Sequence, residues 1–154
     1  MKRVWLGTAF AVLTSGMAGC ATSSHLLTLR ARAAQAYNQE NLPVAESLYT
    51  RLTRAAPADP LLWARLGNVE ALSGHPRQAV NAYNRVLQLK PDFAEIRYNL
   101  AMLRMKQAQA QLIAAADTPH LPPPLAARIH VLSTGISHLG FGAVSAPTRS
   151  GDGH

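Results

Sequence analysis

Apolar positions along the chain fall into three patterns that differ in spacing. Near the N-terminus, an almost unbroken apolar run covers residues 4–13. In the middle of the chain, residue types recur after 34 positions: Ala45, Tyr49 and Pro57 return as Ala79, Tyr83 and Pro91. Toward the C-terminus, apolar residues alternate at spacings of four and three: Leu125, Ile129, Leu132, Ile136 and Leu139. The middle pattern indicates a repeated unit, and the last one predicts an amphipathic helix.

The N-terminal apolar run has the flanks of an export signal. Lys2 and Arg3 precede it, and small residues follow it up to Cys20. The run is too short to span a bilayer, because a spanning helix needs about 20 apolar residues. The stretch 17–20, Met-Ala-Gly-Cys, resembles the lipobox of bacterial lipoproteins, with Met17 where Leu or Val is usual. The alternatives are an ordinary signal peptide with a coincidental cysteine, or a short buried helix.

The lipobox resemblance implies a lipid anchor on Cys20. Residues 1–19 would be the signal peptide, the thiol of Cys20 would carry a diacylglyceryl group, and 20–25 would form a lipidated tether. Ala21 stands where lipoproteins retained at the inner membrane carry Asp, so the resemblance implies a location on the periplasmic face of the outer membrane. Because the chain has a single cysteine, it has no intrachain disulfide and no thiolate zinc site.

The 34-residue recurrence follows a recognisable motif. In the second copy, Trp63-x-x-Leu66-Gly67 precedes Ala79-x-x-x-Tyr83 and Pro91. This arrangement resembles the tetratricopeptide repeat, W-x₂-L-G-x₂-Y…A-x₃-F…P, with Glu70 replacing the first Tyr. The resemblance implies an all-α solenoid in which each repeat is a pair of antiparallel helices, A and B. We assign the first repeat to 26–59 and the second to 60–93.

Small residues and helix breakers explain how such a repeat would fold. Gly67 and Ala79 would let helices A and B approach closely. Pro91 cannot continue helix B and is expected to end it. Gly74 stands where helix A must stop, and Pro76 suits the first turn of the next helix.

A third unit begins with Tyr98-Asn99-Leu100-Ala101 but has no turn where one is expected. Around position 108 the chain carries good helix formers without Gly or Pro. We therefore expect a partial repeat at 94–118 built on one long helix. This helix should run from about Asp92 to Ala116, with Asp92 as its N-cap.

The C-terminal part, 119–139, is expected to be a Pro-rich connector followed by the helix of the last apolar stripe. One interpretation makes this helix a lid on the solenoid, since uncovered Leu100 and Leu103 would face water. The other makes it a partner-binding helix. Gly, Ser, Pro and Thr dominate residues 140–154, which we predict to be a disordered tail.

Catalytic and nucleic-acid-binding signals are missing from the sequence. It contains no H-E-x-x-H, no G-x-S-x-G and no phosphate loop. His130 and His138 could share a helix face, but no Cys or carboxylate completes a metal set. The formal charge of +7 comes from scattered basic residues without interleaved aromatics. We expect no enzyme activity, no metal, no nucleic-acid partner and no cofactor beyond the lipid on Cys20.

The remaining candidate chemistry is a binding surface. In the tetratricopeptide family, helix A lines a concave groove, and carrying its lining positions onto this chain gives the candidate partner-binding residues: Arg30, Tyr37, Asn38, Asn68, Leu72, Tyr98, Met102 and Met105. Their mixture suits an apolar peptide or an amphipathic helix. The alternative is that Tyr98, Met102 and Met105 are core residues beneath the C-terminal helix. Ala34 replaces the first Asn of the carboxylate clamp, which disfavours a receptor for C-terminal peptides of that kind.

Residues 1–116 as a whole also resemble a more specific family. A lipobox, two to three tetratricopeptide repeats and a long final helix beginning Tyr-Asn-Leu-Ala are similar to the TadD-type lipoproteins of tight-adherence (Flp/Tad) pilus assembly. The resemblance implies a pilotin-like assembly factor whose lipid anchor routes an outer-membrane secretin and whose groove holds a secretin segment. The alternative is a periplasmic adaptor that docks cell-wall or envelope enzymes.

Overall fold

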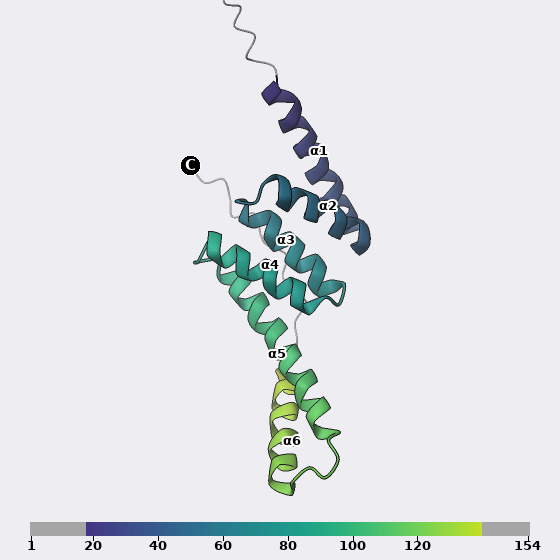
Figure 1. The fold of residues 1–154 in the computed structure, drawn as a ribbon, viewed down its shortest axis with the longest axis vertical. Helices are drawn as coiled ribbons and strands as arrows, with labels where there is room; N and C mark the ends of the chain where they lie inside the picture. The colour runs from purple at the N-terminus through teal and green to yellow at the C-terminus, as the bar shows by residue number, and fades with distance from the viewer. Residues whose placement is uncertain (1–17, 140–154) are drawn as a thin grey trace, which may run out of the picture.

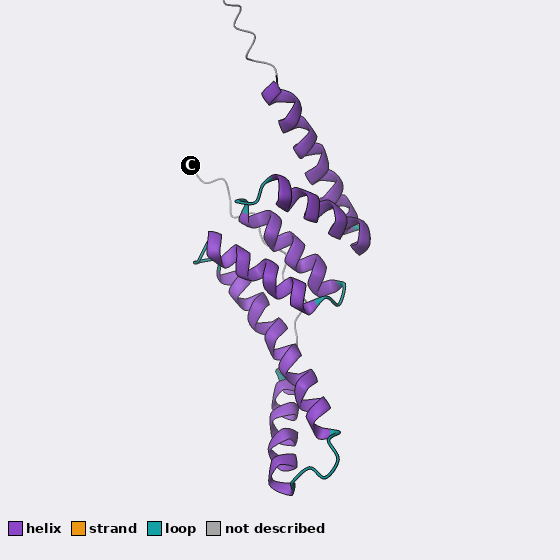
Figure 2. Ribbon diagram, in the orientation of Figure 1, coloured by secondary structure: helices purple, strands orange, loops and turns teal. Residues whose placement is uncertain are grey.

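The computed structural model describes residues 18–139, and all regular elements within this range are helices (Figures 1 and 2). The helices are α1 (Ala18–Asn38), α2 (Leu42–Ala55), α3 (Pro60–Leu72), α4 (Pro76–Leu89), α5 (Ala94–Ala116) and α6 (Pro123–His138). Each helix packs against the next one along the chain, as in a solenoid. The predicted all-α tetratricopeptide solenoid is confirmed.

The predicted signal peptide and the predicted tail are at the two ends of the chain. Most of the predicted signal peptide and the whole predicted tail at 140–154 lie outside the described residues. The range assigned to a tether, 20–25, is helical and continuous with the rest of α1. No Gly or Pro follows Gly19 within α1 to interrupt the helix. None of the described helices is long and apolar enough to cross a membrane.

Turn residues set the ends of the second helical pair. Helix α3 begins after Asp59, whose Oδ1 accepts a hydrogen bond from the Leu61 N–H at 2.9 Å. It ends shortly before Gly74, which has a φ of +76°, a conformation that costs a residue with a Cβ. Pro76 is the first residue of α4. The predicted roles of Gly74 and Pro76 are therefore confirmed.

The predicted N-cap of the long helix is wrong. Helix α5 begins at Ala94, and its N-cap is Phe93 rather than Asp92. The Phe93 N–H donates to the Lys90 carbonyl at 3.3 Å, which closes a turn across Asp92. The Arg97 guanidinium donates to the Pro91 carbonyl at 2.7 Å and braces the same turn. Because this turn occupies 90–93, the N-cap lies one residue later than predicted.

Two buried clusters form the core and meet at Trp63, which packs against both. The first joins α1, α2 and α3, and the second joins α3, α4 and α5. Between α3 and α4, the ring of Tyr83 lies directly over Gly67. A Cβ added at Gly67 would stand 2.6 Å from two carbons of that ring. The close approach predicted for Gly67 therefore exists, and Tyr83 fills the space.

The lid interpretation of the C-terminal helix is wrong. Leu100 and Leu103 are buried in the second cluster against α3 and α4, and none of the residues given for that cluster belongs to α6. Helix α6 instead packs along the distal half of α5, where the Gln109 side chain donates to the Ser137 hydroxyl at 2.8 Å. The two helices form a hairpin that projects from the repeats (Figure 1). Helix α5 is long enough to carry α6 away from the core that α6 was expected to cover.

Candidate functional site

Helices α1, α3 and α5 correspond to the A helices of the repeats, and two contacts hold α1 beside α3. Arg30 of α1 forms an ion pair with Asp59 at the start of α3, with Nη2 and Oδ2 2.7 Å apart. The Arg65 guanidinium of α3 lies 5.6 Å from the centroid of the Tyr37 ring of α1, within the range of a cation–π contact. Arg30 and Tyr37, both predicted groove residues, therefore link neighbouring A helices.

Large apolar side chains are exposed on α3 and α5. Leu61 is 44% exposed, Leu72 is 51% exposed and Tyr98 is 48% exposed. Leu61 and Leu72 are 11 positions apart, about three helical turns, and so they share one face of α3. We call Leu61, Leu72 and Tyr98, with the half-buried Met102 and Met105, the A-helix surface.

The alternative that Tyr98 is a core residue beneath the C-terminal helix is wrong. Its side chain is about half exposed, whereas the neighbouring Asn99 and Leu100 are buried. Met102 and Met105 lie one and two turns further along α5 and are half-buried. Flexible thioether side chains at such positions can adjust to partners of different shape. Asn38, the last residue of α1, is exposed.

Asn68 is not a groove residue, contrary to the prediction. Its side chain is fully buried, and its Oδ1 accepts a hydrogen bond from the Tyr83 hydroxyl at 2.8 Å. Burial raises the pKa of Tyr83, so its hydroxyl keeps the proton that it donates. Asn68 directly follows Gly67, over which the Tyr83 ring of α4 lies.

A second polar group lies between α2, α3 and the loop that follows α3. The Nδ1 atom of His75 is 3.1 Å from Oε2 of Glu70 and 3.5 Å from Oε2 of Glu46. Glu70, which stands where the repeat motif has its first Tyr, is only 7% exposed. Burial raises the pKa of its carboxyl, and the Glu46 charge adds to this effect, while His75 opposes it.

The same three side chains form the one group in the described part of the chain whose donor atoms could surround a metal ion. Their ligand atoms lie within 4.8 Å of one another, and a nitrogen with two carboxylate oxygens is a donor set that zinc accepts. His75 already forms a hydrogen bond with Glu70 of its own repeat, and its contact with Glu46 of the first repeat makes the cluster a polar link between the two repeats. The expectation of no metal stays a prediction.

The fold and these surfaces define a class of protein: a short tetratricopeptide solenoid with an exposed, partly apolar A-helix surface. Comparison with protein families agrees, since residues 67–107 match the family described as TPR repeat. This match covers the end of α3, all of α4 and the first part of α5.

Among curated proteins, the chain is similar to receptors named peroxisomal targeting signal receptor. The protein from Saccharomyces cerevisiae is 39% identical over 69 residues, which is 45% of this chain and 11% of the receptor. The protein from Candida glabrata is 45% identical over 64 residues, 38% of this chain and 11% of the receptor. The chain thus spans about a tenth of the length of these relatives, and the likeness is confined to a repeat segment.

Proposed function

We propose that this protein is a non-catalytic adaptor that binds a protein segment on its A-helix surface. The observation that carries this proposal is the exposure of Leu61, Leu72 and Tyr98 on helices whose opposite faces are buried in the core. Apolar side chains at this exposure lower the free energy of a complex when a partner covers them. The receptors that share the repeat are named for a targeting signal, which supports a peptide segment as the ligand.

The proposed partner is a segment of an outer-membrane secretin, and the proposed role is that of a pilotin-like assembly factor in a Tad/Flp pilus system. The support is the resemblance of residues 1–116 to TadD-type lipoproteins. In this role a lipid anchor on Cys20 holds the protein at the periplasmic face of the outer membrane, because two or more acyl chains give stable membrane attachment. The A-helix surface then holds the secretin segment until it assembles.

The test of the binding surface is a pair of matched double variants. Leu61→Ser with Leu72→Ser removes two side chains that are 44% and 51% exposed, and Leu125→Ser with Leu132→Ser removes two on α6 that are 45% and 53% exposed. We expect the first pair to lower the amount of assembled secretin multimers in the outer membrane and the surface pili. The second pair should leave both near wild type, while circular dichroism shows that both variants keep their helices.

Three outcomes decide between the alternatives. Loss of multimers only in the α6 pair would move the binding surface to the C-terminal helix. A gene deletion that keeps secretin multimers and pili but alters cell shape or osmotic resistance would favour the periplasmic adaptor of envelope enzymes. Equal behaviour of both pairs and wild type, with a deletion phenotype in secretin assembly, would contradict binding through the A-helix surface.

The lipid anchor has its own measurement. Mass spectrometry of the mature N-terminus should show an acylated Cys20. The Cys20→Ser variant should not be processed, and it should no longer be anchored at the outer membrane. A serine variant that is processed normally and stays at the outer membrane would contradict the anchor. The binding-surface proposal would survive that result, since it rests on different residues.

A further inference from the structure

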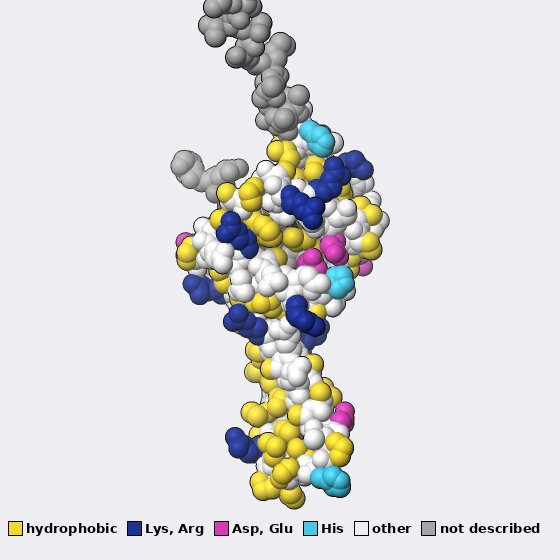
Figure 3. All heavy atoms as spheres, in the orientation of Figure 1, with side chains coloured by type: hydrophobic (Ala, Val, Ile, Leu, Met, Phe, Trp, Pro, Cys, Tyr) yellow, Lys and Arg dark blue, Asp and Glu magenta, His cyan; other side chains and the backbone are white. Residues whose placement is uncertain are grey.

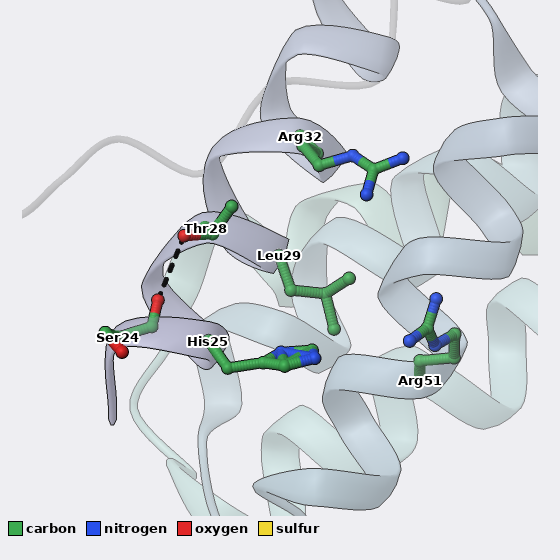
Figure 4. Close-up of a pocket in the computed structure, with 6 residues that line it drawn as sticks. All are labelled: Ser24, His25, Thr28, Leu29, Arg32 and Arg51. Atoms are coloured by element: carbon green, nitrogen blue, oxygen red, sulfur yellow. Dashed lines mark hydrogen bonds between the residues drawn. The ribbon is translucent and has the colours of Figure 1, made fainter. Parts of the chain in front are cut away.

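A hollow of about 360 Å³ opens between α1 and α2, near the N-terminal end of the described chain. Figure 4 shows its lining: Ser24, His25, Thr28, Leu29 and Arg32 from α1, and Arg51 from α2. The two arginine side chains extend from the facing helices on either side of Leu29, and the His25 ring points toward Arg51. None of the predicted groove residues lines this hollow.

The charges around the hollow are of one sign. No acidic residue is among its lining residues. Across residues 18–139, the structure gives neither Arg32 nor Arg51 an ion pair or a hydrogen bond. Arg30, two positions before Arg32, shows the contrast, because it is paired with Asp59. Two guanidinium groups that face one hollow with no acidic side chain in its lining repel each other, and an anion held between them would offset this repulsion.

The donor atoms favour an oxyanion rather than a neutral ligand. Each guanidinium offers several N–H donors in a planar fork that matches phosphate oxygens. The imidazole of His25 adds a further nitrogen. The Thr28 hydroxyl donates to the Ser24 carbonyl at 3.0 Å, so its proton is not directed into the hollow. We propose that this hollow is a binding site for a phosphate group, held by Arg32 and Arg51 with His25 beside them.

Two sources could supply the phosphate group: the headgroup of an anionic phospholipid, whose phosphate charge is not neutralised by choline, or free phosphate. The position in the chain favours the headgroup. Helix α1 begins at Ala18 and contains Cys20, and His25 lies five positions after Cys20, about 7.5 Å along the axis. This assignment of the source rests on the proposed anchoring at Cys20, whereas the phosphate site itself rests on the geometry of the hollow.

The test compares two double variants of the full chain with equal loss of charge. Arg32→Gln with Arg51→Gln empties the hollow of guanidinium groups. Arg77→Gln with Arg104→Gln removes two exposed arginines of α4 and α5 that lie outside it. The first measurement is the ratio of binding to vesicles of phosphatidylcholine with phosphatidylglycerol over binding to phosphatidylcholine alone. Using a ratio cancels the contribution of any acyl chain or apolar N-terminal segment, because both vesicles accept it equally.

We expect the ratio to fall about thirtyfold in the hollow variant, the factor for removing two basic side chains from an anionic membrane surface. The control pair should change it less than about threefold, because distance from the membrane weakens the attraction. The second measurement follows the ring signals of His25 by nuclear magnetic resonance during addition of inorganic phosphate. These signals should shift in wild type and in the control pair and stay unchanged in the hollow variant.

Each result has one meaning. A fall in the ratio together with the His25 shift supports a site for a lipid headgroup phosphate. The His25 shift with an unchanged ratio supports the phosphate site and assigns it to free phosphate. No His25 shift in wild type, or an equal shift in the hollow variant, overturns the proposal. Absence of a lipid on Cys20 by mass spectrometry would refute the anchor alone and leave the outcome for the hollow unaffected.

Discussion

The repeat core and the C-terminal hairpin are both pairs of packed helices, but they are built in different ways. In the core, α1 to α4 and the first part of α5 bury two continuous clusters that share Trp63. In the hairpin, Ile129 is the one buried residue of α6, and within α5 nothing beyond Leu103 is buried. Apolar side chains gather at the surface of this hairpin (Figure 3).

The difference shows what the repeat motif contributes. In the core, a small residue faces a large one where α3 packs against α4: Gly67 faces Tyr83, and the Tyr83 side chain is buried completely. Gly135 of α6 also lies in a helix, but a Cβ there would meet nothing within 4 Å. The core therefore has steric specificity that the hairpin lacks, and we expect the hairpin to open without unfolding the core.

Deleting a large buried side chain in each region should give the largest contrast. Leu52 is fully buried in the first cluster, and Leu52→Ala should lower the free energy of unfolding by about 2–5 kcal/mol. Ile129→Ala should instead release α6. Hydrogen exchange measured by mass spectrometry should then show faster exchange over α2 in the first variant and only over α6 in the second. Faster exchange throughout the chain in Ile129→Ala would mean that hairpin and core unfold together.

Adding one methyl group should act in opposite directions in the two regions. Gly67→Ala places a Cβ 2.6 Å from the Tyr83 ring, and the buried ring can move only by disturbing its hydrogen bond to Asn68. We expect a loss of about 1–3 kcal/mol in urea unfolding. Gly135→Ala meets no atom and gains about 1 kcal/mol of helix propensity, so exchange over α6 should slow. A stabilising Gly67→Ala would contradict the close contact between α3 and α4.

The repeat core and the hairpin also differ in which of their features could be predicted from the sequence. The repeat positions predicted the helical pairs and the turn at Gly74, because these depend on backbone conformation and on steric fit within one motif. The sequence did not indicate that Asn68 is buried, because its hydrogen-bond partner, the Tyr83 hydroxyl, belongs to another helix. The spacing of apolar residues in α6 correctly predicted a helix with one apolar face. The spacing alone does not show which helix packs against that face.

The candidate surface was predictable to a similar extent. The resemblance to the tetratricopeptide family predicted Leu72 and Tyr98 as surface residues of the A helices, and both are exposed. It could not show that Arg30 and Tyr37 are already engaged in contacts between α1 and α3, since these contacts depend on how two helices lie in space. The lipid on Cys20 and the secretin partner stay predictions, because they depend on an enzyme and a protein outside this chain.

The smallest expected effect is on the pH dependence of stability. It arises because the repeat core contains a buried charged side chain and the hairpin does not. Among the described residues, Glu70 is the one charged side chain in the buried set. Its pKa lies above the ordinary value of 4.5 because of burial and the Glu46 charge, against the attraction of His75. Between 4.5 and the raised value, the folded state binds more protons than the unfolded state, so stability falls as the pH rises through this window.

Glu70→Gln cannot ionise, and its stability relative to wild type should therefore increase from pH 4 to pH 7. Urea unfolding at the two pH values measures this difference, with the exposed Glu40→Gln as a control that should change little. A relative stability that instead decreases with pH would mean that the ion pair with His75 outweighs burial, and the core would then gain from the charge that it encloses.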